Sequence, residues 1–313
     1  MGRRQTAAYS GAMGTDQILD SPALQGSFEV IDGLELFVRR TDPSTNQADV
    51  VMVHGLGGMS TNWTDLMHLQ ADRGRRCVAL DLPGFGRSEA DPEGDYSLAR
   101  HSAAVIDLLE TVDGPVNLVG NSLGGAVATT VAAERPDLVR TLTLLAPALP
   151  HVKPGLEKLP IVLGIAPRAA DLLAWARGNQ SAEERVDETM RLVYGDSSRV
   201  NPLRRAEAIV EHNLRAGMPH IWHAFVGSSR GLGWGFVPWR REYLWRRLDE
   251  VQAPVLAVFG TEDRLVDPNI AGRVARTIGG GTVVMMPGIG HCPQMEVPIT
   301  VDRLLDAHIE GQL

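Results

Sequence analysis

The sequence predicts an α/β fold in which a mostly parallel, doubly wound sheet carries a helical insertion near its middle. Short apolar runs alternate with helix-like stretches over residues 48–147, and the same alternation resumes at residue 253. Between these two parts the chain shows helical stretches and aromatic residues without a clear strand. Apolar strands that alternate with helices are typical of parallel sheets covered on both faces. The length of 313 residues suits one large core and an inserted subdomain.

The first half of the core is expected to begin with a hairpin. Residues 26–40 show two strand patterns around Asp32-Gly33, a dipeptide typical of tight turns between antiparallel strands. The strands that follow are short apolar runs bounded by turn residues, at 48–55, 76–84, 115–122 and 138–147. Helices are expected between them, at 63–74, 98–112 and 123–134.

The second half of the core repeats this order after the insertion. Strands are expected at 253–263 and 281–291, and helices at 268–278 and 300–309. The chain is therefore expected to divide into three parts. These are a flexible tail over residues 1–24, a core formed by 25–147 and 249–313, and a helical cap, or lid, formed by 148–248.

Composition and charge exclude several classes of protein. The net charge is −8 and the isoelectric point about 5.6, so nucleic acid is not an expected partner. No apolar run reaches the roughly 18 residues of a membrane span, and the N-terminus lacks the apolar core of a secretory signal. Cys77 and Cys292 are too few for a disulfide framework, which favours a reducing, cytoplasmic location. No motif suggests a metal or an organic cofactor.

One serine lies between glycines where a strand is expected to turn into a helix. Gly120-Asn121-Ser122-Leu123-Gly124 follows the pattern G-x-S-x-G. In this context the pattern predicts a nucleophile elbow, a tight turn that lifts the hydroxyl above the sheet and beside free N–H groups of the helix N-terminus. The alternative is a glycine-rich turn with a capping serine.

A serine hydroxyl needs a base, and the base needs a carboxylate that orients it. His291 follows an expected strand and precedes the last expected helix, which makes it the candidate base. Asp263 lies just after the strand that ends at Gly260 and is the candidate acid. Glu262 and Asp267 are the alternatives on the same loop.

Four motifs in this order resemble the α/β-hydrolase family. They are "HGLGG" (54–58), "DLPGFGRS" (81–88), "GNSLGG" (120–125) and "GTEDRLVDP…GHCPQMEVP" (260–298). The resemblance implies the α/β-hydrolase fold and a catalytic triad of Ser122, Asp263 and His291. It also implies an oxyanion hole formed by the N–H groups of Leu123 and Leu56, with Gly57 as the alternative to Leu56. His54 and Asp81 are expected to hold loops in place.

The insertion contains Trp175, Trp222, Trp234, Trp239 and Trp245. Large side chains in a small subdomain serve most simply to fill its core. Taken together they favour an apolar acyl or aromatic pocket beneath the cap, and Trp234 and Trp239 are the candidate substrate-binding residues. Arginines follow in the same stretch, at 240, 241, 246 and 247. They are expected to form a solvated helix face, with attraction of an anionic substrate or lipid surface as the alternative.

Three functions follow from these features. The first is a serine hydrolase that cleaves a small-molecule carboxylic ester through an acyl-serine intermediate. The second is a carbon–carbon hydrolase that resembles the meta-cleavage-product hydrolases, with the same triad. Those enzymes usually carry tryptophan after the base and Gly-Pro-Gly at the oxyanion loop, whereas this chain has Cys292 and Gly55-Leu56-Gly57, which favours the ester. The third is a non-catalytic ligand-binding protein. The sequence leaves the oligomeric state open.

Overall fold

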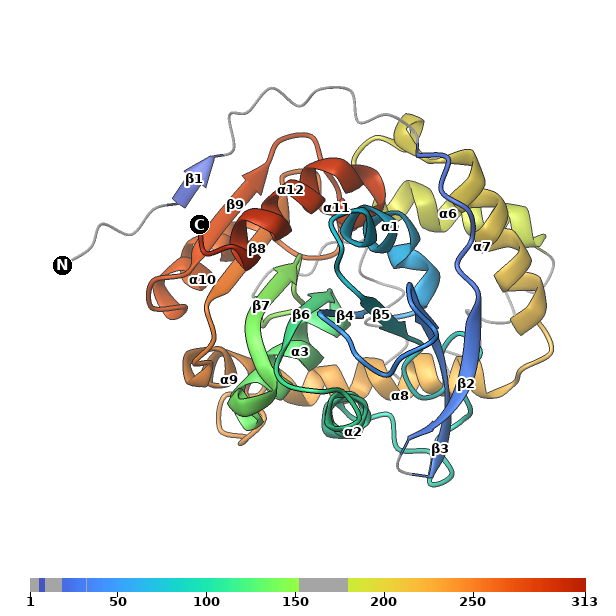
Figure 1. Ribbon diagram of the computed structural model, residues 1–313, viewed down its shortest axis with the longest axis horizontal. Coiled ribbons are helices and arrows are strands. Elements are labelled where there is room, and N and C mark those ends of the chain that lie inside the picture. Colours follow the sequence, from blue (N-terminus) through green and yellow to red (C-terminus); the bar gives the residue numbers. More distant parts are fainter. Residues whose placement is uncertain (1–5, 9–18, 32, 152–179) are drawn as a thin grey trace.

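The computed structural model describes residues 6–8, 19–31, 33–151 and 180–313, and in them it shows a nine-stranded sheet (Figure 1). The strand order is β1-β9-β8-β7-β6-β4-β5-β3-β2. The strands are β1 (Thr6–Ala8), β2 (Gly26–Ile31), β3 (Leu34–Arg40), β4 (Val50–Val53), β5 (Cys77–Leu80), β6 (Val116–Asn121), β7 (Val139–Leu145), β8 (Val255–Gly260) and β9 (Thr282–Met286). The predicted α/β class with a mostly parallel sheet is confirmed.

Antiparallel pairing is confined to one end of the sheet. Strand β2 pairs antiparallel with β3, and β3 pairs antiparallel with β5. The β2–β3 turn contains Gly33 at a φ of 77°, whereas Asp32 lies outside the described residues. All other pairings are parallel. The carboxyl ends of these strands therefore meet at one edge, where α/β proteins place their functional loops.

The central strands are buried on both faces. In β4, Val51 and Val53 belong to one apolar cluster, whereas Val50 and Met52 belong to a second cluster on the opposite face. Side chains of a strand alternate between the two faces, so a strand covered on both sides is apolar without interruption. This burial explains why the strands were recognisable in the sequence as short apolar runs.

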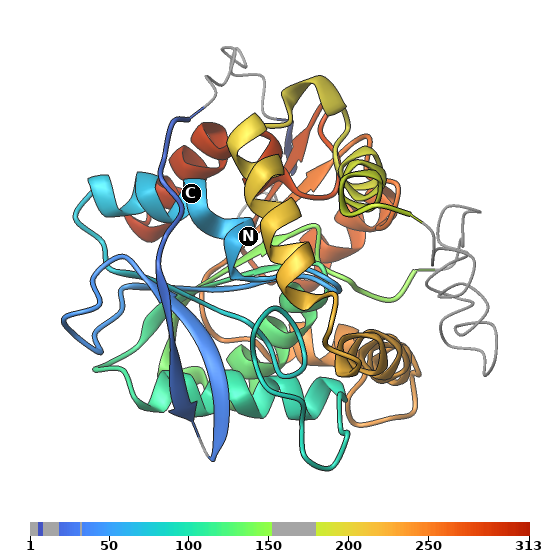
Figure 2. The same ribbon diagram turned by 90° about the vertical axis from the view of Figure 1, so that its right-hand side faces the viewer.

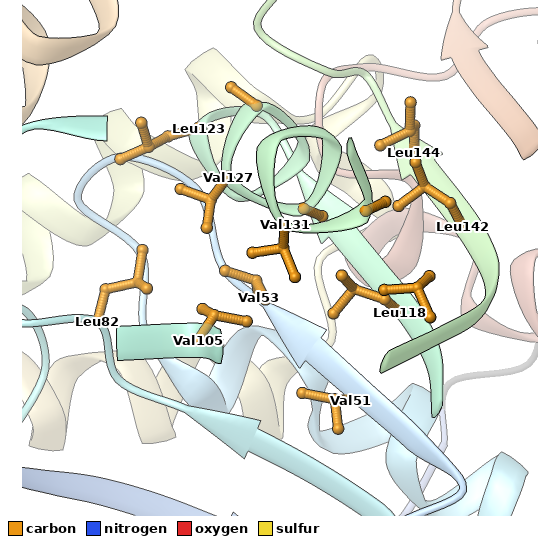
Figure 3. Packing of buried hydrophobic residues seen from close by; sticks show 14 of the residues in the cluster. Val51, Val53, Leu82, Val105, Leu118, Leu123, Val127, Val131, Leu142 and Leu144 are labelled. Atoms are coloured by element: carbon orange, nitrogen blue, oxygen red, sulfur yellow. The ribbon is translucent and has the colours of Figure 1, made fainter. Parts of the chain in front are cut away.

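Two layers of helices cover the sheet. Figure 3 shows part of the first cluster, in which Val105 of α2 and Val127 and Val131 of α3 meet Val53 and Leu118 of the sheet. Helices α2 (Leu98–Glu110), α3 (Leu123–Glu134), α9 (Leu244–Glu250) and α10 (Ala271–Thr277) contribute to this cluster. Helices α1 (Thr64–Asp72) and α12 (Pro298–Ile309) contribute to the second cluster and lie above the sheet in Figure 1. Short helices are η1 (Ser60–Trp63), η2 (Pro136–Leu138), η5 (Pro268–Ile270) and α11 (Pro293–Glu296).

The described part of the insertion is helical, as predicted. It contains α6 (Ala182–Val193), η4 (Ser197–Arg199), α7 (Pro202–Arg215) and α8 (His220–Gly235), and in Figure 2 α6 and α7 lie in front of the sheet. Ser181 and Glu184 form a capping box at the start of α6. Asn201 caps α7, whose first residue is Pro202. Residues 152–179, and with them Trp175, lie outside the described residues.

Helix α9 packs into the core although the expected cap extends to residue 248. Leu244, Trp245 and Leu248 belong to the first apolar cluster together with residues of α3. Arg247 is buried and forms an ion pair with Glu134 of α3. Part of the expected cap thus packs against α3 of the core. Arg247 serves this packing and does not belong to a solvated arginine face.

The described part of the N-terminal segment contacts the rest of the molecule. Strand β1 pairs parallel with β9. The carbonyl of Leu19 accepts a hydrogen bond from Asn201 at 2.9 Å, and the carbonyl of Leu24 accepts one from Arg39 at 3.0 Å. The expectation of a flexible tail did not anticipate these contacts. Within the described ranges, no helix has the length and apolar character needed to cross a membrane.

Candidate active site

Ser122 lies at a sharp turn between β6 and α3, with a φ of 55° and a ψ of −117°. A residue with a side chain rarely adopts a positive φ, and such residues cluster at functional sites. The turn requires glycine on both sides. A methyl group on Gly120 would lie 2.3 Å from the carbonyl oxygen of Gly124, and one on Gly124 would lie 2.1 Å from the carbonyl oxygen of Val53. The G-x-S-x-G pattern is therefore a steric requirement of this turn.

The loop after β4 lies beside this turn because β4 and β6 are neighbours in the sheet. A methyl group on Gly55 would lie 3.0 Å from Cβ of Ser122. The N–H of Gly58 donates to the carbonyl of Gly55 at 3.0 Å, which closes a turn with Leu56 and Gly57 at its tip. Gly57 has a φ of 73°, the conformation that favours glycine at the third position of a type II turn. Both candidates for the second oxyanion donor thus lie on this turn.

The N-terminus of α3 begins directly after Ser122. The N–H of Ser122 donates to the carbonyl of Leu145 at 3.1 Å, so this N–H already has a partner within the protein. Leu123 is the first residue of α3, and the first N–H groups of a helix have no partner within it. The positive end of the helix dipole also favours negative charge at this position. Leu123 is thus suitably placed to stabilise an oxyanion.

His291 and Asp263 form a hydrogen-bonded pair, with 2.8 Å between Nδ1 of His291 and Oδ2 of Asp263. Both side chains are almost completely buried. The other oxygen of Asp263 accepts N–H bonds from Leu265 at 2.7 Å and Val266 at 2.9 Å. These contacts hold the carboxylate toward the imidazole and leave Nε2 of His291 as the nitrogen available for proton transfer.

The two other acidic residues of this loop lie in different surroundings from Asp263. Glu262 is exposed. Asp267 caps η5 by accepting the N–H of Asn269 at 3.0 Å. The geometry therefore favours Asp263 as the acid over both alternatives.

Asn121 connects two segments of the site. One is the turn at Ser122, and the other is the loop of residues 287–292 that carries His291, called the base loop. The Nδ2 of Asn121 donates to the carbonyl of Leu145 at 2.9 Å and to the carbonyl of His291 at 3.0 Å. The residue before the serine thereby holds the backbone of the histidine. Cys292 donates from Sγ to Oδ1 of the same asparagine at 3.5 Å. Burial, with the nearby Asp263 carboxylate, raises the pKa of the Cys292 thiol, which keeps it protonated and unreactive.

His54 and Asp81 hold loops in place, as expected. Nδ1 of His54 lies 2.7 Å from the carbonyl of Gly55, and its Nε2 accepts the N–H of Leu82 at 3.0 Å. Burial lowers the pKa of His54, which keeps the ring neutral for these two bonds. Asp81 accepts the N–H groups of Ser60 at 2.6 Å and Arg87 at 2.9 Å. These residues fix the oxyanion loop against the turn after β5.

Trp234 and Trp239 are exposed, with 56% and 85% of their surface accessible. The guanidinium of Arg240 lies over the Trp234 ring at 4.7 Å. Side chains that line a pocket beneath a cap are expected to be buried, so this exposure argues against the predicted substrate-binding role. Trp234 lies in the last turn of α8, and Trp239 lies in the turn that follows. At such positions the sequence pattern does not indicate which side chains face inward, which is why the prediction selected exposed residues.

Aromatic residues that sequence reasoning did not select lie at the other end of α8. A methyl group on Gly57 would lie 3.5 Å from the ring of Phe225. Phe225 stacks on Trp222, with ring centroids 5.6 Å apart and planes 5° apart. The spacing of three residues on one helix face was the available signal. These two residues bring apolar surface to the oxyanion loop.

Buried ion pairs connect the cap to the core. Glu211 of α7 contacts Arg39 of β3 at 2.9 Å and Arg87 at 2.8 Å. The Glu211 and Arg39 side chains are each 5% exposed. The single carboxylate thus pairs with two arginines at this interface. Across the described ranges, no group of three or more histidine, cysteine or acidic residues is arranged to hold a metal ion.

The fold and the arrangement around Ser122 define a hydrolase of the α/β class. The chain belongs to the alpha/beta hydrolase fold family, whose model matches residues 50–298. It is similar to a 2-hydroxy-6-oxononadienedioate/2-hydroxy-6-oxononatrienedioate hydrolase of Burkholderia vietnamiensis, with 26% identity over 301 residues that cover 93% of this chain and 98% of the relative.

Other relatives include a lipase. A monoacylglycerol lipase of Xenopus laevis is 23% identical over 278 residues, which cover 83% of this chain and 74% of the lipase. The solved structure of a 2-hydroxy-6-oxo-6-phenylhexa-2,4-dienoate hydrolase from a Rhodococcus species superposes with a TM-score of 0.72 at 21% identity, covering 92% of this chain and 99% of the other. The relatives thus include both carbon–carbon and ester hydrolases.

Proposed function

We propose that this protein is a serine hydrolase that cleaves a carboxylic ester with a small-to-medium apolar acyl group through an acyl-serine intermediate. The observation that carries the proposal is the buried His291–Asp263 pair, whose backbone is tied by Asn121 to the strained turn at Ser122. A nucleophile, a base and an orienting acid are the three groups that acyl transfer to serine needs.

In this mechanism His291 accepts the proton of Ser122 at Nε2 while the serine oxygen attacks the ester carbonyl. The N–H groups of Leu123 and of Leu56, or of Gly57 in its place, stabilise the oxyanion that develops. The imidazolium, stabilised by Asp263, then protonates the leaving alcohol. A water molecule activated by His291 attacks the acyl-serine, and collapse of the second oxyanion releases the carboxylic acid and restores Ser122.

The surroundings of the oxyanion loop favour an apolar acyl group. Phe225 and Leu56 are partly buried against the first apolar cluster, and Trp222 stacks on Phe225. Apolar walls with a few directed polar groups are typical of small-molecule sites. Arg39 and Arg87 both form ion pairs with Glu211, so their guanidinium groups are engaged at the interface between cap and core.

Carbon–carbon cleavage with the same three residues is the second candidate. It is favoured by one observation, the similarity to the Burkholderia hydrolase over almost the whole length of both chains. The two reactions differ in the bond that breaks and in the charge of the substrate.

Two measurements test these proposals. Covalent labelling of Ser122 by a fluorophosphonate probe is expected for either hydrolase, and absence of labelling in the folded protein would favour the non-catalytic alternative. Turnover of p-nitrophenyl esters is then compared with turnover of a dienoate ring-fission product. A higher kcat/KM for the esters supports the proposal, and the reverse order overturns it in favour of carbon–carbon cleavage.

A further inference from the structure

Glu296 is a buried carboxylate that lies next to the base loop. It is the last residue of α11, and its side chain is completely inaccessible. Four N–H groups donate to it: Gly290 at 2.8 Å and Gly195 at 2.9 Å to Oε2, and Asp196 at 3.1 Å and Arg199 at 2.8 Å to Oε1. Burying a carboxylate is costly unless it is fully hydrogen-bonded, and bonds to an ionised acceptor are stronger than neutral ones.

The four donors come from two segments that are far apart in the sequence. Gly290 belongs to the base loop and directly precedes His291. The other three donors belong to residues 195–199 of the cap, a segment between α6 and α7 that includes η4 and is called the cap connection. Glu296 therefore joins the cap connection to the residue next to the candidate base.

Further contacts hold these two segments together. The N–H of His291 donates to the carbonyl of Val193 at 2.7 Å, and Arg199 donates to the carbonyl of Gly288 at 3.0 Å. A methyl group on Gly195 would lie 2.6 Å from the carbonyl oxygen of Gly288 and 2.8 Å from the nitrogen of Gly290. The cap connection and the base loop are thus in direct backbone contact.

We propose that Glu296 is a positioning residue with two effects. It sets the location of His291, and it holds the cap connection against the base loop. The inference rests on the proposed role of His291 as the base. Asp263 binds the imidazole of His291, and Asn121 binds its carbonyl. The N–H of His291 donates to Val193. Glu296 binds the N–H of the preceding residue, Gly290. Misplacement of a reacting group by about 1 Å costs roughly 100-fold in rate, so this anchoring bears on catalysis.

The experiment compares Glu296→Gln with Glu310→Gln, which makes the same change at an exposed ion pair at the C-terminal end of α12. In Glu296→Gln one carboxylate oxygen becomes an NH₂ that faces either the N–H groups of Gly290 and Gly195 or the donors of Asp196 and Arg199, and the negative charge is lost. Either orientation weakens the joint between the base loop and the cap. We expect kcat to fall roughly 10- to 100-fold with KM changed less than about threefold. We also expect slower fluorophosphonate labelling, a displaced acid limb of the pH profile and a shifted low-field proton resonance of the His291–Asp263 bond. Glu310→Gln is expected to match the parent protein.

Arg199→Met and Gly195→Ala alter the same contact, but they change residues of the cap instead of Glu296. Arg199→Met removes one of the four donors and leaves three, so a smaller fall in kcat, about two- to fivefold, is expected. Gly195→Ala pushes a methyl group into the backbone of the base loop and is expected to slow labelling and move the same proton resonance. These variants decide the question if Glu296→Gln does not fold.

The results separate failure of this inference from failure of the proposed function. A parent protein that is not labelled at Ser122 overturns both. A labelled parent, with folded variants at 296, 199 and 195 that keep its kcat, pH profile and proton resonance, overturns the positioning role alone.

Discussion

Ser122 combines a functional side chain with an unfavourable backbone. Its positive φ costs on the order of 1–3 kcal/mol and persists because the surrounding structure determines it. The N–H of Ser122 is held by Leu145, and its carbonyl accepts bonds from Ala126 and Ala148 at 3.1 and 2.9 Å. The strain is thus carried by main-chain contacts, independently of the hydroxyl.

We therefore expect Ser122→Ala to keep the fold and lose turnover. The variant retains every backbone contact of the turn but lacks the nucleophile, so kcat is expected to fall by roughly 10⁴- to 10⁶-fold. Ester hydrolysis and circular dichroism of the purified variant check the two halves of this prediction. Near-parental hydrolysis would rule out Ser122 as the nucleophile.

Asp263→Asn is expected to lower kcat by roughly 10³- to 10⁴-fold. An amide at this position donates to Nδ1 of His291 and stabilises the wrong tautomer of the imidazole. Steady-state kinetics of Asp263→Asn, with Asp267→Asn as the matched control on the same loop, provide the measurement. A larger loss in Asp267→Asn would assign the acid to Asp267 instead.

At the scale of an element, α8 contributes opposite kinds of surface at its two ends. Phe225 approaches the oxyanion loop, whereas Trp234 is exposed near the C-terminus of the helix. The apolar wall of the proposed site is therefore expected from Trp222 and Phe225.

This arrangement predicts how acyl chain length affects the reaction. For p-nitrophenyl esters, kcat/KM is expected to rise a few-fold per CH₂ until the pocket is filled, because burying a methylene contributes about 0.8 kcal/mol. Phe225→Ala should flatten the series, whereas Trp239→Ala, at a position that is 85% exposed, should leave it unchanged. If Trp239→Ala alone changed the dependence of kcat/KM on chain length, the apolar wall of the site would lie near the C-terminal end of α8 instead.

Sequence reasoning succeeded for elements whose signals are local. Apolar runs marked the buried strands, and the glycines around Ser122 marked a turn that only glycine permits. It did not anticipate the packing of α9 on α3, the contacts of the N-terminal segment, or Glu296, because each depends on partners far away in the chain. The exposure of Trp239 likewise follows from tertiary contacts and not from its residue type.

For the whole molecule, buried histidines couple stability to pH. His101 is completely buried, and its Nε2 lies 2.8 Å from Oγ of Ser228 on α8. Burial, with the nearby His54, lowers the pKa of His101 to about 3 from its ordinary value of 6.5. Burial also lowers the pKa of His54 and of His308. These rings are therefore neutral in the folded protein at pH values where the unfolded chain binds protons.

Stability is consequently expected to fall in acid. Between pH 6.5 and about 3 the unfolded chain binds a proton at His101 that the folded chain does not bind. The contribution is complete above pH 6.5 and decreases below it, by about 1.4 kcal/mol per pH unit. Urea unfolding at several pH values checks this, and His101→Gln should reduce the slope, with the exposed His223→Gln as the control. An unchanged slope in His101→Gln would contradict it.

The pairing of β7 with β8 places Leu145 beside Val258 although the whole cap lies between these strands in the sequence. The sheet therefore closes the cap into a loop whose two ends are fixed. The entropic cost of closing a loop grows only with the logarithm of its length, by about 0.6 kcal/mol per doubling. As far as chain entropy is concerned, a longer or shorter cap that keeps its contacts with the core would thus change the stability of the sheet little. The same non-local pairing is expected to slow folding, because bringing β8 beside β7 closes a loop as long as the cap.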